Sequence, residues 1–149
     1  IMMVIVISIG FLRGFYSHYY KWEPPLSKQQ FLVSGSEGGV FTSSKVYAEV
    51  EGIIDYVRSS KIDTMFVYEY APLFYFVSGV YNPTAYDLVD NSSFYKPYQS
   101  EIITDIEKVR TNTIITGYSV LEDNTEISMY IKQCYSINKL LYDHIIWTK

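Results

Sequence analysis

The sequence has almost none of the residue types that build metal centres or covalent active sites. It holds one cysteine and two histidines among 149 residues. A single cysteine excludes an internal disulfide and a cysteine-rich zinc site. His18 and His144 lie far apart, and neither has a partner at the spacing of metal ligands, so no metal site is predicted. We expect Cys134 to be a small buried hydrophobe on the apolar face of a helix.

Charge is also scarce, and the sequence has no basic track. The 12 lysines and arginines are scattered and the net charge is −4, which argues against a nucleic-acid partner. Hydrophobic residues make up 48% of the chain and charged residues 19%, so the chain is not intrinsically disordered. Its length is that of one domain with a sizeable core.

Tyrosine, in contrast, is abundant, with 16 copies. A tyrosine ring is apolar and its hydroxyl is polar, so tyrosine suits half-buried surfaces, interfaces and membrane boundaries. The alternative is a genome whose composition favours Tyr, Ile, Asn and Lys.

Residues 1–12 (IMMVIVISIGFL) carry no charge, and an aromatic stretch ending at Trp22 follows them. Twelve residues are too few to span a bilayer, which takes about 20. An uncharged run before an aromatic belt is typical of a transmembrane helix that leaves the membrane. We therefore expect residues 1–22 to be the protruding end of such a helix, residues 23–28 to be a proline-stiffened linker, and the chain to be part of a longer protein. The alternative is a buried first strand.

Residues 29–149 alternate between apolar strand patterns and amphipathic helix patterns, which predicts a soluble α/β domain. Crossover helices between strands favour a small, mostly parallel sheet of four to six strands, flanked by helices. Strands are predicted at 31–33, 40–41, 63–70, 85–89, 113–118 and 140–147, and helices at 44–60, 72–79, 97–109 and 125–134. The glycines at 35–39 match neither a dinucleotide fingerprint nor a P-loop and are expected to form a turn.

Residues 67–84 form the most informative segment, because a strand runs into a proline-started aromatic helix that stops at Gly79. Open α/β sheets bind ligands where parallel strands end, so we expect this segment at the carboxyl edge of the sheet. No two carboxylates are spaced convincingly for acid–base chemistry, and no catalytic residue is predicted. The candidate substrate-binding residues are Glu69, Tyr70, Tyr75, Tyr81 and Asn82, with Phe74 as a further aromatic candidate.

The same segment resembles the C-terminal soluble domain of glycosyltransferase family 39, the dolichyl-phosphate-mannose-protein mannosyltransferase-like membrane enzymes. The similarity begins with Gly38-Gly39-Val40 and continues through the strand at 65–67 and the sequence PLFYFVSG at 72–79. It then includes Asn82-Pro83-Thr84 and QSEII at 99–103. Family members commonly read YFLSGR before NPT, so Val80 stands where an arginine is usual, and any role of that arginine is missing.

The resemblance implies a non-catalytic domain on the extracytoplasmic side of the membrane, attached to the rest of a multi-spanning glycosyltransferase. In that family the catalytic acids lie near the first transmembrane helices, outside this chain. The expected partners are therefore the membrane, the parent protein and a polyprenyl-phosphate sugar donor. No cofactor is expected in the chain itself, and whether the parent protein needs a metal stays open.

Two alternatives remain. A free-standing soluble α/β domain would need polar groups converging at the sheet edge, for which Glu69, Ser78, Asn82 and Asp87 are available. An interaction module would instead use the tyrosine-rich surface to bind another protein.

Overall fold

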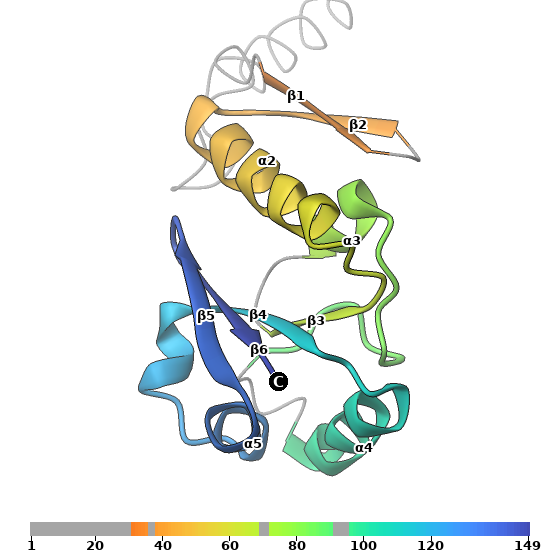
Figure 1. Cartoon of the computed structure of the whole chain (residues 1–149), viewed down its shortest axis with the longest axis vertical. Helices are drawn as coiled ribbons and strands as arrows, with labels where there is room; N and C mark the ends of the chain where they lie inside the picture. Colours follow the sequence, from red (N-terminus) through yellow and green to blue (C-terminus); the bar gives the residue numbers. More distant parts are fainter. Residues whose placement is uncertain (1–30, 36–37, 69–71, 91–95) are drawn as a thin grey trace, which may run out of the picture.

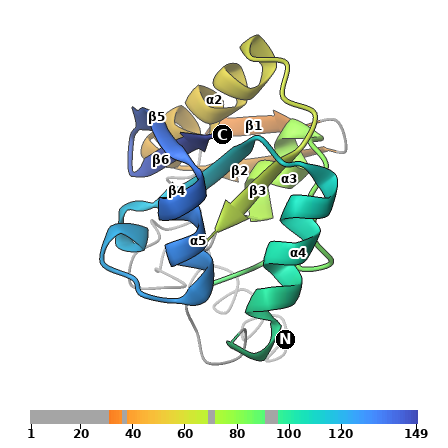
Figure 2. The same ribbon diagram turned by 60° about the horizontal axis from the view of Figure 1, so that its bottom comes forward.

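The computed structural model describes residues 31–35, 38–68, 72–90 and 96–149. The predicted membrane segment at 1–22 and the linker at 23–28 lie outside the described residues. The described part is an α/β fold with layers stacked one over another (Figure 1). In Figure 1 a two-stranded hairpin lies above a pair of helices, the main sheet lies below them, and two further helices lie below the sheet. Figure 2, turned so that the bottom comes forward, shows these last two helices in front of the sheet.

The hairpin consists of β1 (Phe31–Gly35) and β2 (Gly38–Thr42), which pair in antiparallel orientation. The main sheet has four strands in the order β3-β4-β6-β5. These strands are β3 (Met65–Tyr68), β4 (Thr113–Gly117), β5 (Ser136–Leu141) and β6 (His144–Thr148). The helices are α2 (Ser44–Ser59), α3 (Pro72–Ser78), α4 (Gln99–Val109) and α5 (Glu126–Cys134), with short 3₁₀ turns η2 (Lys96–Tyr98) and η3 (Tyr118–Leu121).

The expectation of a mostly parallel sheet is wrong, because the main sheet is mixed. β3 and β4 pair in parallel, while β6 is antiparallel to both β4 and β5. The predicted single strand at 140–147 is divided between the end of β5 and most of β6: the chain reverses at Tyr142 and Asp143, and Tyr142 adopts a positive φ of 53°. The glycine or asparagine that usually marks such a turn is missing there, and the apolar pattern runs on through it.

Alternating side chains of the central strands divide the core in two. One cluster lies between the sheet and α4 with α5, and it includes Phe66, Tyr68 and Ile114. The other lies between the sheet and α2 with α3, and it includes Met65 and Val67. Both faces of β3 are therefore covered, as in buried parallel strands.

Local sequence signals place the helix ends well. The Ser43 hydroxyl accepts a hydrogen bond from the Val46 N–H at the start of α2, and Thr125 caps α5 in the same way. Gly79 ends α3 with a φ of 68°, a conformation that glycine adopts without a steric penalty. The expectation that Cys134 is buried is wrong, because it lies exposed at the end of α5.

Candidate functional site

Helix α3 folds back along the outer edge of β3, and a hydrogen bond from β3 to Tyr75 holds the helix in this position. The Val67 N–H donates a hydrogen bond to the Tyr75 hydroxyl oxygen over 2.7 Å. Burial raises the pKa of the Tyr75 phenol, and the hydrogen bond from Val67 offsets only part of that effect. Because its hydroxyl accepts a hydrogen bond from the backbone of the sheet, we assign Tyr75 a structural role rather than a substrate-binding one.

Tyr81 does not lie at the carboxyl edge of the sheet, contrary to expectation. After α3 the chain returns to the amino end of β3, where Tyr81 forms a parallel bridge with Thr64. The Tyr81 N–H donates to the Asp63 carbonyl over 3.1 Å, and the Met65 N–H donates to the Tyr81 carbonyl over 3.3 Å. The side chain of Tyr81 is 63% exposed, so its ring is available at this amino edge.

Asn82 holds the loop that follows. Its amide nitrogen donates to the Tyr86 carbonyl over 2.9 Å and to an Asp87 carboxylate oxygen over 3.2 Å. Its amide oxygen accepts from the Thr84 N–H over 3.0 Å, which closes an Asx turn. These bonds shape residues 82–87 into a compact loop, and the strand predicted at 85–89 does not form.

The remaining candidates divide into buried, exposed and undescribed residues. Glu69 and Tyr70 lie outside the described residues, so no position is assigned to them. Phe74 is buried between α3 and the sheet, where it serves the core. Phe76 is 42% exposed, although the sequence did not single it out as a binding residue. Among the described residues of this segment, the exposed aromatic rings are those of Phe76 and Tyr81.

The structure also forms a carboxylate–imidazole pair that the sequence did not reveal. A His144 ring nitrogen hydrogen-bonds Glu49 of α2, and both side chains are 16% exposed. The edge of the Phe74 ring packs against His144, with 5.1 Å between ring centroids. Such a pair could hold a histidine for acid–base chemistry. Because its members lie 95 residues apart, no local spacing could have predicted it.

The neighbours of this pair favour a structural role. Asp143 forms an ion pair with Lys45 over 2.9 Å, and the Tyr142 ring lies directly over Gly52. Three consecutive residues of the β5–β6 turn thus contact positions 45, 49 and 52 on one face of α2. We interpret the Glu49–His144 pair as part of this clamp between helix and turn.

A second polar cluster lies where β3 and β4 end. The Tyr68 hydroxyl donates to an Asp123 carboxylate oxygen over 2.7 Å, and the Thr125 hydroxyl donates to the same oxygen over 2.8 Å. Burial alone would raise the pKa of Asp123, but the hydrogen bonds from these hydroxyls and from the Thr125 and Asn124 N–H groups together outweigh it and lower that pKa. The cluster also caps α5, since the Ser128 N–H donates to the Thr125 hydroxyl.

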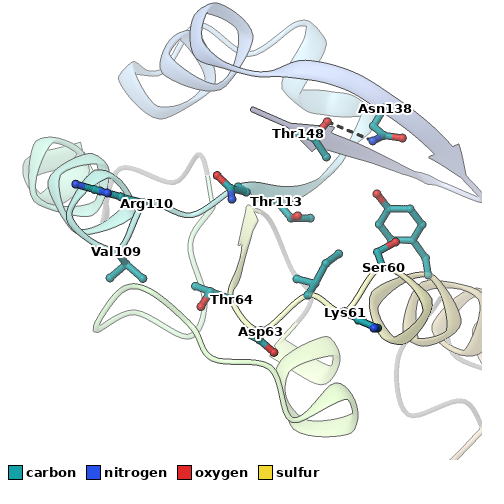
Figure 3. A pocket seen from close by; sticks show the side chains of 12 residues that line it. Ser60, Lys61, Asp63, Thr64, Val109, Arg110, Thr113, Asn138 and Thr148 are labelled. Atoms are coloured by element: carbon teal, nitrogen blue, oxygen red, sulfur yellow. Dashed lines mark hydrogen bonds between the residues drawn. The ribbon is translucent and has the colours of Figure 1, made fainter.

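The described residues form a polar pocket of about 490 Å³ at the amino edge of β3 and β4, opposite to the predicted edge (Figure 3). The ends of α2 and α4 form two of its walls, and β5 and β6 form a third. Its lining consists of Tyr56, Ser60, Lys61, Ile62, Asp63, Thr64, Val109, Arg110, Asn112, Thr113, Asn138 and Thr148. Tyr81 neighbours this pocket, because its bridge partner Thr64 is a lining residue.

Within the described ranges, no group of three or more His, Cys, Asp or Glu side chains could hold a metal ion. None of the helices in the described part of the chain is long and apolar enough to cross a membrane. No family model, curated protein or solved structure matches this chain.

Proposed function

We propose that this chain is the non-catalytic, extracytoplasmic C-terminal domain of a membrane glycosyltransferase similar to family 39. In this proposal the parent enzyme moves a sugar from a polyprenyl-phosphate donor to an acceptor. The domain helps to shape the site where donor or acceptor binds. The uncharged residues 1–12 and the aromatic belt after them support a membrane-anchored parent protein.

One observation carries the proposal: in its described residues, the segment with the family resemblance binds several polar groups internally and leaves the rings of Phe76 and Tyr81 exposed. The hydroxyl of Tyr75 and the amide of Asn82 are bound to neighbouring backbone groups. The Ser78 hydroxyl donates to the Phe74 carbonyl. Phe76 and Tyr81 are exposed beside these fixed groups. A rigid segment that presents aromatic rings suits docking of a sugar or a lipid better than covalent chemistry.

The test is sugar transfer by the full-length parent protein carrying Tyr81→Ala or Phe76→Ala. We expect kcat/KM to fall about two- to tenfold, the loss that corresponds to one aromatic contact, with the fold unchanged by circular dichroism. Tyr118→Ala is the matched control, because Tyr118 is also 42% exposed but lies after β4. Transfer by the isolated chain, or equal losses in all three variants, would contradict the proposal.

A second candidate function is that of a free-standing α/β ligand-binding domain, which the amino-edge pocket favours. Sequencing the gene upstream of residue 1 separates the two candidates. Several hydrophobic spans in the same reading frame support the transferase, whereas a start codon just before residue 1 supports the free-standing domain.

A further inference from the structure

We infer that the amino-edge pocket binds a single neutral sugar ring, with Tyr81 as the aromatic platform beside it. This inference deepens the proposed function, on which it rests, by naming the chemistry of the ligand and its place. The pocket volume of about 490 Å³ is within the range of small-molecule sites, which is roughly 300–1,000 Å³.

The lining supplies hydrogen-bonding groups without a dominant charge. Most of its polar members are amides and hydroxyls, including those of Asn112, Asn138 and Thr148. Asn138 donates to the Thr148 hydroxyl over 3.2 Å, and this pair faces the pocket (Figure 3). Amides and hydroxyls both donate and accept hydrogen bonds, as the hydroxyls of a sugar require.

The electrostatics of the walls disfavour an anion. α2 and α4 both direct their C-terminal ends at the pocket, since their C-caps, Ser60 and Arg110, are lining residues. A helix C-terminus carries a partial negative charge, which repels phosphate or carboxylate groups. Lys61 and Asp63 bring one charge of each sign to the lining. Arg110 also lines the pocket, but in Figure 3 its nitrogen end points away from the other labelled side chains. The charges and helix ends around the pocket therefore favour an uncharged ligand.

Tyr81 adds the feature that separates a sugar from a simple polyol. Its backbone is hydrogen-bonded to Asp63 and Met65, and Asp63 is a lining residue, so Tyr81 is fixed next to the pocket with its ring exposed. An aromatic face packs against the C–H groups of a pyranose ring, whereas glycerol has no such ring. Polar groups in the pocket lining and an exposed aromatic residue next to the pocket match the two surfaces of a pyranose.

The experiment is a ¹⁵N-resolved NMR titration of the full 149-residue chain, kept in a detergent without a sugar headgroup. The probes are methyl α-mannoside, mannose 1-phosphate, inorganic phosphate and glycerol. We expect methyl α-mannoside to shift the amides of Thr64, Asn112 and Asn138 saturably, on the order of millimolar concentrations. Mannose 1-phosphate should bind more weakly, and phosphate or glycerol should give no saturable shift.

Asn112→Ala should weaken binding of methyl α-mannoside about fivefold, the loss expected for one hydrogen bond. Tyr81→Ala should weaken it to a similar extent. Asn124→Ala is the matched control, because Asn124 is an exposed asparagine outside the pocket, and it should bind as the unmodified chain does. The inference is overturned if methyl α-mannoside gives no saturable shift, if glycerol shifts the same amides equally, or if phosphate binds more tightly than the neutral sugar.

Failure of this inference is distinguishable from failure of the proposed function. If the chain binds the sugar but Tyr81→Ala leaves transfer by the parent protein unchanged, the proposed function fails and the site stands. If transfer falls in Tyr81→Ala but the pocket amides do not respond to sugar, this inference alone fails.

Discussion

At the scale of single residues, tyrosine hydroxyls complete the hydrogen bonding of the core. Tyr75 accepts from a strand N–H, Tyr135 donates to the Thr111 carbonyl over 2.7 Å, and Tyr68 donates to Asp123. Each ring fills apolar space while its hydroxyl hydrogen-bonds a polar group of the surrounding structure. Neither an interface nor a compositional bias is needed to explain these three tyrosines.

Tyr75→Phe should lower the free energy of unfolding by about 1–2 kcal/mol, because it leaves the buried Val67 N–H without its acceptor. Urea unfolding followed by circular dichroism measures this loss. Tyr81→Phe is the control at an exposed ring and should change stability by less than about 0.5 kcal/mol. Equal effects of the two substitutions would show that the hydroxyl of Tyr75 does not support the sheet.

At the scale of elements, the stability that the cap of α5 contributes depends on pH. Hydrogen bonds from Tyr68 and Thr125 stabilise the charged form of Asp123 and hold its pKa below the ordinary value, although burial acts in the opposite direction. As the pH falls, Asp123 therefore binds its proton at a higher pH in the unfolded chain than in the folded chain. Asp123 thus contributes stability above a pH of about 4, and this contribution is lost as the pH falls further.

We accordingly expect Asp123→Asn to be less stable than the unmodified chain at pH 6, with the difference narrowing toward pH 2. Chemical unfolding at several pH values measures both chains. Glu122→Gln removes a carboxylate at the exposed neighbouring position and is the control for the change of net charge. A difference for Asp123→Asn that stays constant with pH would show that its carboxylate plays no special part in the cap.

How far the sequence predicts an element depends on whether its signal is local. Helices α2, α3 and α5 were predicted closely because Ser43, Gly79 and Thr125 act on neighbouring backbone groups. The β5–β6 turn was missed because the conformation of Tyr142 is supported by contact with a distant helix rather than by turn residues. The position of Tyr81 was missed for a similar reason, since the path of the chain after α3 depends on pairing between Tyr81 and Thr64.

At the scale of the whole molecule, α2 and the β5–β6 turn form one unit. A side chain at Gly52 would place its Cβ 2.6 Å from a ring carbon of Tyr142, so this helical glycine leaves room for the ring. Alanine favours a helix over glycine by about 1 kcal/mol, but contact with the ring opposes that gain.

We therefore expect Gly52→Ala to raise the free energy of unfolding by about 0.5–1 kcal/mol more in a Tyr142→Asn chain than in the unmodified chain. Asparagine tolerates the positive φ of this turn and lacks the ring. Urea unfolding of the four chains of this double-mutant cycle gives the coupling. Additive effects would show that the ring and the helix are energetically independent.

The fixed edge of β3 has a consequence for self-association. The Met65 and Val67 N–H groups are already bound by Tyr81 and Tyr75, so this side of the sheet offers no free donor at either position to an incoming strand. β5 forms the opposite edge, and within the described residues no strand lies beyond it. A second copy could extend the sheet by joining β5 to β5, which would leave a blocked β3 at both outer ends. Growth of the main sheet by strand addition would then stop at two molecules.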